Sequence, residues 1–441
     1  MDKRLRQRIT YFESFEEREE AFRESVSFLI PRRHMGAGLF WEDFGRITRE
    51  GLREPKGSPV TYITCNPRDC LAFGTARQVL NAAALSVGQG GSDLPAFTRR
   101  VGEGFGMGEN MDQPIRTLSG GETVKLALAK VYIASARISR VSIASPFSWL
   151  SAENAGIFQR LMDRLLERRI PVSLFALSGE DSKEAIGPGD PFPMNGSEGI
   201  GFSLDLKDVK IPLSLTVNPM QSRSAFARVE DFQAGMASPC LVSGNNGQGK
   251  SLVARILAGA IRFSGTATIA RDGKRGTARL LFQDVATQTM LRSFSALCAS
   301  CPGDGRAVLD LYQGIRKAFE GAYGGRTAPT PRIRPADCGE DRPLLEIKAI
   351  LAAARLAQGP PALILDEPDW GLTREAAVAF VSSVIKTAHR EGVPVLIISH
   401  KPWWAPVAKS LLRVSRSPKR DAGEEARAIF SIRLDAEGGR A

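Results

Sequence analysis

Short apolar runs, separated by glycine-rich or polar turns, recur along the second half of the chain. They cover residues 239–243 (PCLVS), 278–282 (ARLLF), 361–365 (PALIL) and 393–399 (VPVLIIS). Runs of this length and composition predict buried strands, whereas the segment 252–261 (LVARILAGAI) has a helical pattern. Continuously apolar strands are typical of a parallel sheet that is covered on both faces. The pattern therefore predicts an α/β fold.

A glycine-rich turn, GNNGQGKS, connects the first of these strands to the helical segment. Its glycines allow backbone N–H groups to wrap a phosphate, and the N-terminus of the following helix adds positive dipole. The lysine would reach the outer phosphates and the serine would ligate magnesium. An ordinary glycine-rich turn is the alternative, but the eight-residue match and its flanking elements favour a phosphate-binding loop. The candidate nucleotide-binding residues are Asn245, Asn246, Gly247, Gln248, Gly249, Lys250 and Ser251.

Polar residues follow the three other strands at their C-terminal ends, where ligands bind in parallel sheets. Asp366 would hold magnesium, and Glu367 would orient and polarise an attacking water. His400 follows the last strand and could contact a γ-phosphate, the alternative being a structural loop histidine. Gln283 follows the strand 278–282 and could ligate magnesium or a water. Glu367, His400 and Gln283 are the candidate catalytic residues, and Ser251, Gln283 and Asp366 the candidate metal ligands.

These residues resemble the motifs of ATP-binding cassette (ABC) ATPases, namely the Walker A loop, the Q-loop, the Walker B strand and the switch histidine. The family's signature motif has a match in the first half of the chain, LSGGE, followed by the helical segment TVKLALAKVYIA. The resemblance implies that this motif closes over the γ-phosphate of ATP held by the opposite cassette. It therefore adds to the nucleotide-binding residues Leu118, Ser119, Gly120, Gly121 and Glu122.

The first half also resembles a degenerate copy of the second, as expected for an internal repeat. Aligning ASPFSWLS (144–151) with DEPDWGLT (366–373) places Ala37 and Gly38 where the family has lysine and serine. Cys65 then replaces the Q-loop glutamine, and Ala144 and Ser145 replace the two carboxylates. In the second half, RPLLE (342–346) stands where a signature is expected. Each half keeps what the other lacks, which predicts one working composite site and one that binds nucleotide poorly or not at all.

The predicted fold is two tandem P-loop cassettes, each a mainly parallel sheet with a helical subdomain, in a pseudo-twofold head-to-tail arrangement. The predicted boundaries are 1–180 for the degenerate cassette, 181–204 for a linker rich in Gly, Pro and Ser, and 205–441 for the intact cassette. The alternative for the first half is a helical accessory domain in which LSGGE is accidental.

The resemblance departs from the family at several positions. Asn218 lies about where an aromatic residue usually stacks on adenine, and Phe226 is a weak substitute. Thr373 replaces the aspartate that usually ends the loop after Walker B. Trp403 and Trp404, after His400, could form a partner surface, although a packed element is favoured.

Composition and charge narrow the function classes. Of 441 residues, 43% are hydrophobic and 24% charged, which excludes a largely disordered chain. The formal charge of +11 favours an anionic partner. Six cysteines are too few for a disulfide scaffold, and the pairs Cys298/Cys301 and Cys65/Cys70 fall short of a structural zinc site. The opening residues lack a secretory signal, and no run could cross a bilayer.

We therefore expect a cytoplasmic ATPase that uses ATP and Mg²⁺, with the two cassettes paired within one chain and the chain itself monomeric. The favoured output is the energising of a membrane transporter, because the segments FQDVATQ and CNPRDCLAFGTARQVL resemble energy-coupling-factor and cobalt-type importer ATPases. That output needs a separate integral membrane partner, which would hold the protein peripherally at the inner face of the cell membrane. The alternatives are a soluble twin-cassette protein acting on ribosomes or DNA, for which direct nucleic-acid binding is less favoured, and a nucleotide-gated switch with little turnover.

Overall fold

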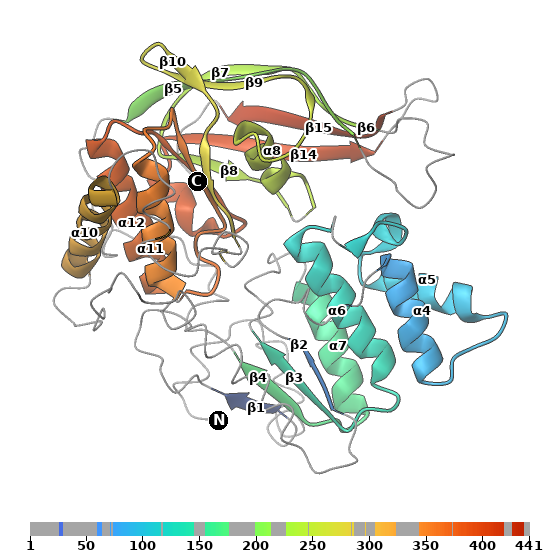
Figure 1. Ribbon diagram of the computed structural model, residues 1–441. Coiled ribbons are helices and arrows are strands. Elements are labelled where there is room, and N and C mark those ends of the chain that lie inside the picture. The colour runs from blue at the N-terminus through green and yellow to red at the C-terminus, as the bar shows by residue number, and fades with distance from the viewer. Residues whose placement is uncertain are drawn as a thin grey trace. The chain divides into compact units, whose positions relative to one another are not determined.

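The chain divides into two compact units in the computed structural model (Figure 1). The first unit comprises Met1–Ser182 with Gly371–Arg374, and the second comprises Lys183–Trp370 with Glu375–Ala441. The structure describes residues 26–29, 60–63, 71, 74–115, 118–144, 155–175, 199–212, 226–245, 247–283, 285, 296, 305–322, 344–372, 374–418 and 426–435.

The first unit contains a four-stranded sheet in the order β1-β4-β3-β2, in which every pair is parallel. Helix α6 packs against both α4 and α7. Most residues of α6 are buried, because its sequence is apolar on nearly every face. The strands are β1 (Val26–Leu29), β2 (Val60–Ile63), β3 (Arg140–Ala144) and β4 (Val172–Phe175). The helices are α4 (Ala76–Ser86), α5 (Leu94–Gly104), the short 3₁₀ helix η3 (Gly108–Asn110), α6 (Gly120–Ala134) and α7 (Ala155–Glu167).

Arginine side chains satisfy the C-terminal carbonyls of three helices in this unit. A cation at a helix C-terminus also interacts favourably with the negative end of the helix dipole. Part of the excess of basic over acidic residues in the chain therefore has a structural role. The bonds are Arg137 to Ser86 O (3.2 Å) after α4, Arg160 to Gly104 O (2.6 Å) at α5 and Arg168 to Ser135 O (3.4 Å) after α6.

The second unit is built on a mixed sheet of 11 strands, whose main path runs β10-β9-β5-β6-β15-β14-β8-β13-β12-β11. Strands β14, β8, β13, β12 and β11 are mutually parallel, as the sequence predicts. At the other end, β5 pairs antiparallel with β6, β7 and β9, and this part goes beyond the expected parallel sheet. The strands are β5 (Ile200–Pro212), β6 (Phe226–Val229), β7 (Phe232–Ser238), β8 (Cys240–Ser243), β9 (Ser264–Arg271), β10 (Lys274–Gly276), β11 (Arg279–Leu281), β12 (Leu363–Asp366), β13 (Val395–Ile398), β14 (Ser410–Pro418) and β15 (Ala426–Asp435).

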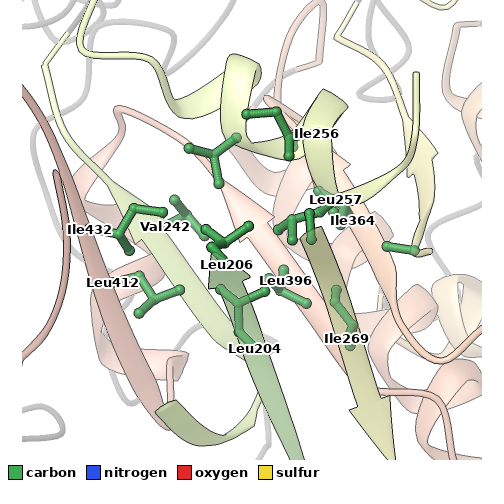
Figure 2. Close-up of a cluster of buried hydrophobic side chains, with 14 of the residues drawn as sticks. Leu204, Leu206, Val242, Ile256, Leu257, Ile269, Ile364, Leu396, Leu412 and Ile432 are labelled. Carbon is green, nitrogen blue, oxygen red and sulfur yellow. The ribbon is translucent and has the colours of Figure 1, made fainter. Parts of the chain in front are cut away.

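Helix α8 (Lys250–Leu257) follows the phosphate-loop sequence and packs between the parallel and antiparallel parts of this sheet. Figure 2 shows its Ile256 and Leu257 against leucines and isoleucines from both parts. Alternate residues of the central strands face opposite sides, since Ile364 belongs to this cluster whereas Leu363 and Leu365 do not, yet all three are buried. Burial on both faces accounts for the continuous apolar runs in the sequence. The other helices of this unit are α10 (Gly305–Ala322), α11 (Leu344–Leu356), α12 (Arg374–Arg390) and the 3₁₀ helix η9 (Pro402–Val407).

Two sequence expectations can be compared directly with the structure. Strand β5 begins at Ile200, within the range expected to be linker, and continues across the predicted boundary at 205. Trp403 and Trp404 are buried within η9, 1% and 0% exposed, and their rings meet edge to face, so they form a packed element and not an exposed partner surface. Within the described part of the chain, no helix is long and apolar enough to span a membrane.

Candidate functional site

The candidate catalytic residues of the second unit lie along one edge of the parallel sheet. In the order β8-β13-β12-β11, each strand ends next to a residue that the sequence singles out. Asp366 pairs with Ile398, and Ile398 pairs with Val242, so the ends of β12, β13 and β8 are level. Leu281 pairs with Leu365, and Gln283 and Glu367 each lie two residues beyond this pair, so they are level with one another. The sheet therefore positions the phosphate-loop residues, His400, Glu367 and Gln283 at a common edge.

The phosphate-loop sequence adopts a backbone that requires glycine at defined positions. Gly249 has φ +97° and Gly247 has φ +81°, a region that side chains with a Cβ rarely adopt. A Cβ on Gly249 would also come within 2.5 Å of the Phe430 ring, and one on Gly244 within 2.4 Å of the Val414 carbonyl oxygen. The C-terminal strands β14 and β15 thus lie directly against the loop and leave no space for larger residues.

Lys250 is the first residue of α8, and its ammonium folds back over the loop. Its Nζ donates hydrogen bonds to Gly244 O (2.7 Å) and Asn245 O (3.2 Å). Burial lowers the pKa of Lys250 below its ordinary value, while the charges of Glu367 and Asp366 act in the opposite direction. A buried cation that donates to neutral loop carbonyls is well suited to bind a stronger anion such as a phosphate.

Ser251 and Asp366 face one another across the site. Ser251 Oγ donates a hydrogen bond to Asp366 Oδ1 at 3.0 Å, from α8 to the end of β12. Burial and the neighbouring charge of Glu367 raise the pKa of Asp366 to about 7, against the hydrogen bond from Ser251. A nearby cation would stabilise the ionised form of this carboxylate, which its surroundings otherwise disfavour.

Glu367 and His400 form the second pair. Their side chains are 8% and 4% exposed, and His400 Nδ1 lies 3.0 Å from Glu367 Oε1. The backbone N–H of His400 also points to Glu367 Oε2, at 3.4 Å. Burial alone would raise the pKa of Glu367, but the charge and hydrogen bonds of His400, with Lys250, lower it to about 2. Glu367 is therefore ionised at neutral pH and can accept a hydrogen bond from water.

The other ring nitrogen of His400, Nε2, is buried and has no hydrogen-bond partner among the described residues. Buried polar atoms are nearly always paired, so an orphaned nitrogen at a sheet edge indicates a place for a ligand group. Nδ1 is occupied by Glu367, which leaves Nε2 for that ligand.

ATP and Mg²⁺ fit this donor set. The glycine loop and the N-terminus of α8 provide an anion cradle, and Lys250 supplies a buried cation. Ser251 and Asp366 provide two oxygen ligands, the type that magnesium prefers, 3.0 Å apart. Gln283 is half-buried at the same edge.

In the first unit, the signature-like residues form the start of α6. Ser119 is the N-cap, and its Oγ accepts a hydrogen bond from the Glu122 N–H (3.3 Å). Glu122 Oε2 accepts the Ser119 N–H (2.7 Å), and Glu122 Oε1 accepts a bond from Asn110 Nδ2 (2.8 Å). Gln113 Nε2 in turn donates to Asn110 Oδ1 (2.8 Å). Both carboxylate oxygens of Glu122 are thus engaged within the unit, while the hydroxyl proton of Ser119 has no acceptor among the described residues.

Some expectations lie outside the described residues. Among the nucleotide-binding candidates this applies to Asn246. It applies also to most of the positions that define the degenerate site and to the two cysteine pairs. These positions are Ala37, Gly38, Cys65, Ser145, Arg342, Pro343, Thr373, Asn218, Cys70, Cys298 and Cys301. Among the described residues, no group of His, Cys, Asp and Glu is arranged to hold a metal ion.

Sequence reasoning missed several supporting residues. The side-chain oxygen of Gln248, itself a nucleotide-binding candidate, accepts a hydrogen bond from the Arg416 backbone N–H, which ties the phosphate loop to β14. Asp369 accepts a bond from Ser399 Oγ at 3.1 Å. Asn110 supports Glu122. Asp369, Ser399 and Asn110 belong to no sequence motif. The available signal for Asp369 and Ser399 was only that each is a polar residue close in sequence to a candidate residue.

The geometry defines a P-loop α/β fold, and comparison with solved structures specifies it further. No protein-family model matches the chain, and no curated protein matches it in sequence. A structure described as a model of ribosome-bound archaeal Pelota and ABCE1 matches 92% of this chain and 74% of its own, with 14% identity and a TM-score of 0.54. The chain thus has the α/β fold of ABC ATPase structures over most of its length.

Two other solved structures are similar to smaller degrees. The RNase-L Inhibitor is 14% identical, with coverage of 94% of this chain and 86% of that chain and a TM-score of 0.48. The cbiO1 protein from Clostridium perfringens, part of the ABC transporter complex cbiONQ, is 17% identical over 50% of this chain and 86% of that chain, with a TM-score of 0.34.

Proposed function

We propose that this protein binds and hydrolyses ATP at one composite ABC-type site. The observation that carries the proposal is the arrangement at the sheet edge of the second unit. There a buried lysine, a serine–aspartate pair and a glutamate–histidine pair meet a glycine cradle. ABC ATPase structures share this fold at low sequence identity, which supports the proposal without establishing the activity.

The chain's own residues divide the work as follows. The loop N–H groups and Lys250 bind the β- and γ-phosphates, and Ser251 and Asp366 hold the magnesium ion, which supplies charge neutralisation when bound. Glu367 accepts a hydrogen bond from water and orients it for in-line attack on the γ-phosphorus. In its doubly protonated form, His400 donates from Nδ1 to Glu367 and from Nε2 to a γ-phosphate oxygen. Gln283, two residues beyond β11, would bind the metal or a water beside it.

We also propose that the first unit completes this site. In the ABC ATPases that the sequence resembles, the signature serine, its glycines and the following helix N-terminus close over the γ-phosphate. The Ser119 hydroxyl proton and the N-terminus of α6 offer the same donors here. The opposite composite site has Ala37 in place of the lysine and RPLLE in place of a signature motif. It would therefore lack both the lysine ammonium and the serine hydroxyl, so each chain would hydrolyse ATP at one site.

The decisive test compares wild type with Glu367→Gln, which keeps the size of the side chain but removes its charge. We expect ATP turnover to fall about 10²- to 10⁴-fold, the usual contribution of a positioned base, while ATP still binds. Phosphate release under excess Mg²⁺–ATP measures turnover, and calorimetry measures binding. Equal and negligible turnover in both proteins would overturn the hydrolysis proposal and leave a nucleotide-gated switch.

For the output of the ATPase, we propose that it energises a membrane transporter through a separate integral membrane partner. The support is the resemblance of FQDVATQ and CNPRDCLAFGTARQVL to importer ATPases. The second candidate is a soluble protein acting on ribosomes or DNA. It is favoured by one observation, the fold match over 92% of the chain to a ribosome-bound assembly.

Affinity capture can separate these outputs. Glu367→Gln would be used as bait in Mg²⁺–ATP, from detergent-solubilised membranes and from the soluble fraction, with Lys250→Ala as the control that cannot hold ATP. An integral membrane protein recovered only with Glu367→Gln would support the transporter. Ribosomal RNA or DNA recovered in the same ATP-dependent way would support the second candidate.

A further inference from the structure

Lys348 is a buried charge that the proposed chemistry does not use. It lies on α11, two residues beyond the RPLLE segment, and is 1% exposed. Its helix neighbours Ile347, Ala349 and Ile350 are buried apolar residues. An apolar side chain would suit this position, because burying an ammonium is unfavourable unless the charge is well paired. The lysine therefore calls for a specific set of partners.

Two hydrogen-bond acceptors of Lys348 lie in the turn that follows Glu367. Lys348 Nζ donates to Pro368 O (2.8 Å) and to Trp370 O (2.6 Å), two carbonyls of the same turn. The ammonium also lies 5.7 Å from the centre of the Trp370 ring, within range of a cation–π contact. Two short charge-assisted hydrogen bonds to one turn fix its position relative to α11.

The turn itself holds Glu367 in an unfavourable backbone conformation. Glu367 has φ +45°, a left-handed value that is unfavourable for a residue with a Cβ. Trp370 N donates to Glu367 O at 3.1 Å, which closes the turn. Such a conformation persists only where the surroundings impose it.

The same turn is tied to the histidine loop. Asp369 Oδ1 accepts a bond from Ser399 Oγ (3.1 Å), and Ser399 Oγ accepts the Lys401 N–H (3.1 Å). These bonds flank His400 on both sides. The position of the turn therefore sets the distance between Glu367 and His400, the two groups expected to hold water and γ-phosphate.

We propose that Lys348 is a positioning residue of the ATPase site, whose buried ammonium anchors the 367–370 turn and so keeps the Glu367 carboxylate against His400. Without the ammonium, two carbonyls lose their donor and Glu367 can relax from its left-handed conformation. The carboxylate would then move away from His400 and from the water it orients. Lys348 touches neither nucleotide nor metal in this arrangement, so ATP binding would be retained.

The inference rests on the proposed ATPase function, and the test is Lys348→Met in the full chain, which keeps side-chain volume and removes the charge. We expect kcat to fall about 10- to 100-fold, because a displacement of about 1 Å in a catalytic group costs up to 10²-fold. KM for Mg²⁺–ATP and Kd for Mg²⁺–ADP should stay within about twofold. Turnover is expressed per mole of bound nucleotide, so a loss of folded protein does not count as a loss of kcat.

The matched control is Arg271→Met. Arg271 is also a buried cation that donates to a carbonyl, that of Gly392. Gly392 precedes β13, at the end of the strand opposite His400. This variant should lose stability but keep its kcat. A loss of kcat equal to that of Lys348→Met would show a general effect of removing buried cations and would overturn the proposal.

A second variant, Lys348→Gln, keeps one neutral donor and should retain more kcat than Lys348→Met. Unchanged kcat in Lys348→Met, or an equal loss of kcat and of nucleotide affinity, would overturn the positioning role. Failure of both variants to fold would make Lys348 a stability element only. If wild type and Glu367→Gln both lack turnover, the ATPase proposal fails first and the role of Lys348 fails with it.

Discussion

At the scale of single residues, Asp366 and Glu367 show how neighbours assign different tasks to two adjacent, buried carboxyl groups. The pKa of Asp366 is raised to about 7 by burial and by the Glu367 charge. The pKa of Glu367 is lowered to about 2, because His400 and Lys250 outweigh burial. One carboxyl is thus destabilised until a cation arrives, and the other stays ionised to bind water. Such divergent pKa values are characteristic of functional sites.

A first prediction follows from the raised pKa of Asp366. Below pH 3.8, its ordinary pKa, the group is protonated whether folded or unfolded. Between that value and about 7 the folded state keeps a proton that the unfolded state has lost, so stability decreases as pH rises. In Mg²⁺-free solution, Asp366→Asn should therefore gain stability relative to wild type between pH 5 and pH 8.

Urea denaturation at the two pH values measures this difference. Asp310→Asn is the control, because Asp310 lies exposed on α10 and its substitution changes no buried group. If Asp366→Asn followed the wild-type pH dependence, the carboxyl of Asp366 would not be destabilised by burial in the folded protein.

A second prediction concerns the phosphate-loop lysine. Lys250→Ala removes the buried cation that now bonds to Gly244 O and Asn245 O, and it should abolish ATP binding. Ala37→Lys restores a lysine at the matching position of the first half and should change little, because the serine and the carboxylates are missing there as well. Equilibrium binding of a fluorescent ATP analogue distinguishes the variants. ATP binding by Lys250→Ala at wild-type affinity would exclude the loop as the phosphate site.

At the scale of elements, α6 begins with a capping box that also presents the signature serine. Ser119→Ala should destabilise the protein by about 1 kcal/mol, whereas Ser119→Gly should cost only a few tenths, about the usual difference at an N-cap. Both variants lack the hydroxyl, so both should lose ATPase activity to the same extent if that hydroxyl serves the nucleotide.

The chain offers a matched control for this prediction at α4, where Thr75 and Gln78 form a second capping box. Thr75→Ala and Thr75→Gly should reproduce the stability difference and leave ATP turnover unchanged. Thermal denaturation and phosphate release are the two measurements. ATPase activity that tracked stability in all four variants would reduce Ser119 to a helix cap.

Elements whose signal is local could be predicted from the sequence. The apolar runs gave β8, β11, β12 and β13, and the glycine loop with LVARILAGAI gave α8, because burial on both faces and phosphate-loop chemistry each leave a pattern in consecutive residues. The candidate site residues could be placed at the ends of those strands for the same reason, and their roles stay predictions. Strand β5 was missed at its start, since its pairing with β6, β7 and β9 joins distant segments. Lys348 was missed because its bonds to Pro368 O and Trp370 O involve main-chain oxygens, which no sequence motif encodes.

At the scale of the whole molecule, the antiparallel part of the sheet helps to position the candidate site. The core between the two parts of the sheet holds α8 by Val253, Ile256 and Leu257, and so holds the N-terminus at which Lys250 and Ser251 begin. Strands β14 and β15 close against the glycines of the phosphate loop. A site of this kind therefore depends on the complete second unit and not on the motif alone.

The last prediction concerns how many sites the chain uses. If one composite site works, Glu367→Gln should bind one ATP per chain at saturation, as measured by calorimetry on the full chain.

Gly120→Asp places a carboxylate at the N-terminus of α6, where the proposed function puts the γ-phosphate, and like charges in a desolvated site repel. This variant should still bind ADP, which lacks that phosphate, but its turnover should fall at least tenfold. The control, Gly156→Asp, substitutes an exposed glycine in the first turn of α7 whose Cβ would meet nothing within 4 Å, and should leave turnover unchanged. Two ATP per chain, or full turnover in Gly120→Asp, would mean that the two halves act independently and that LSGGE takes no part in the site.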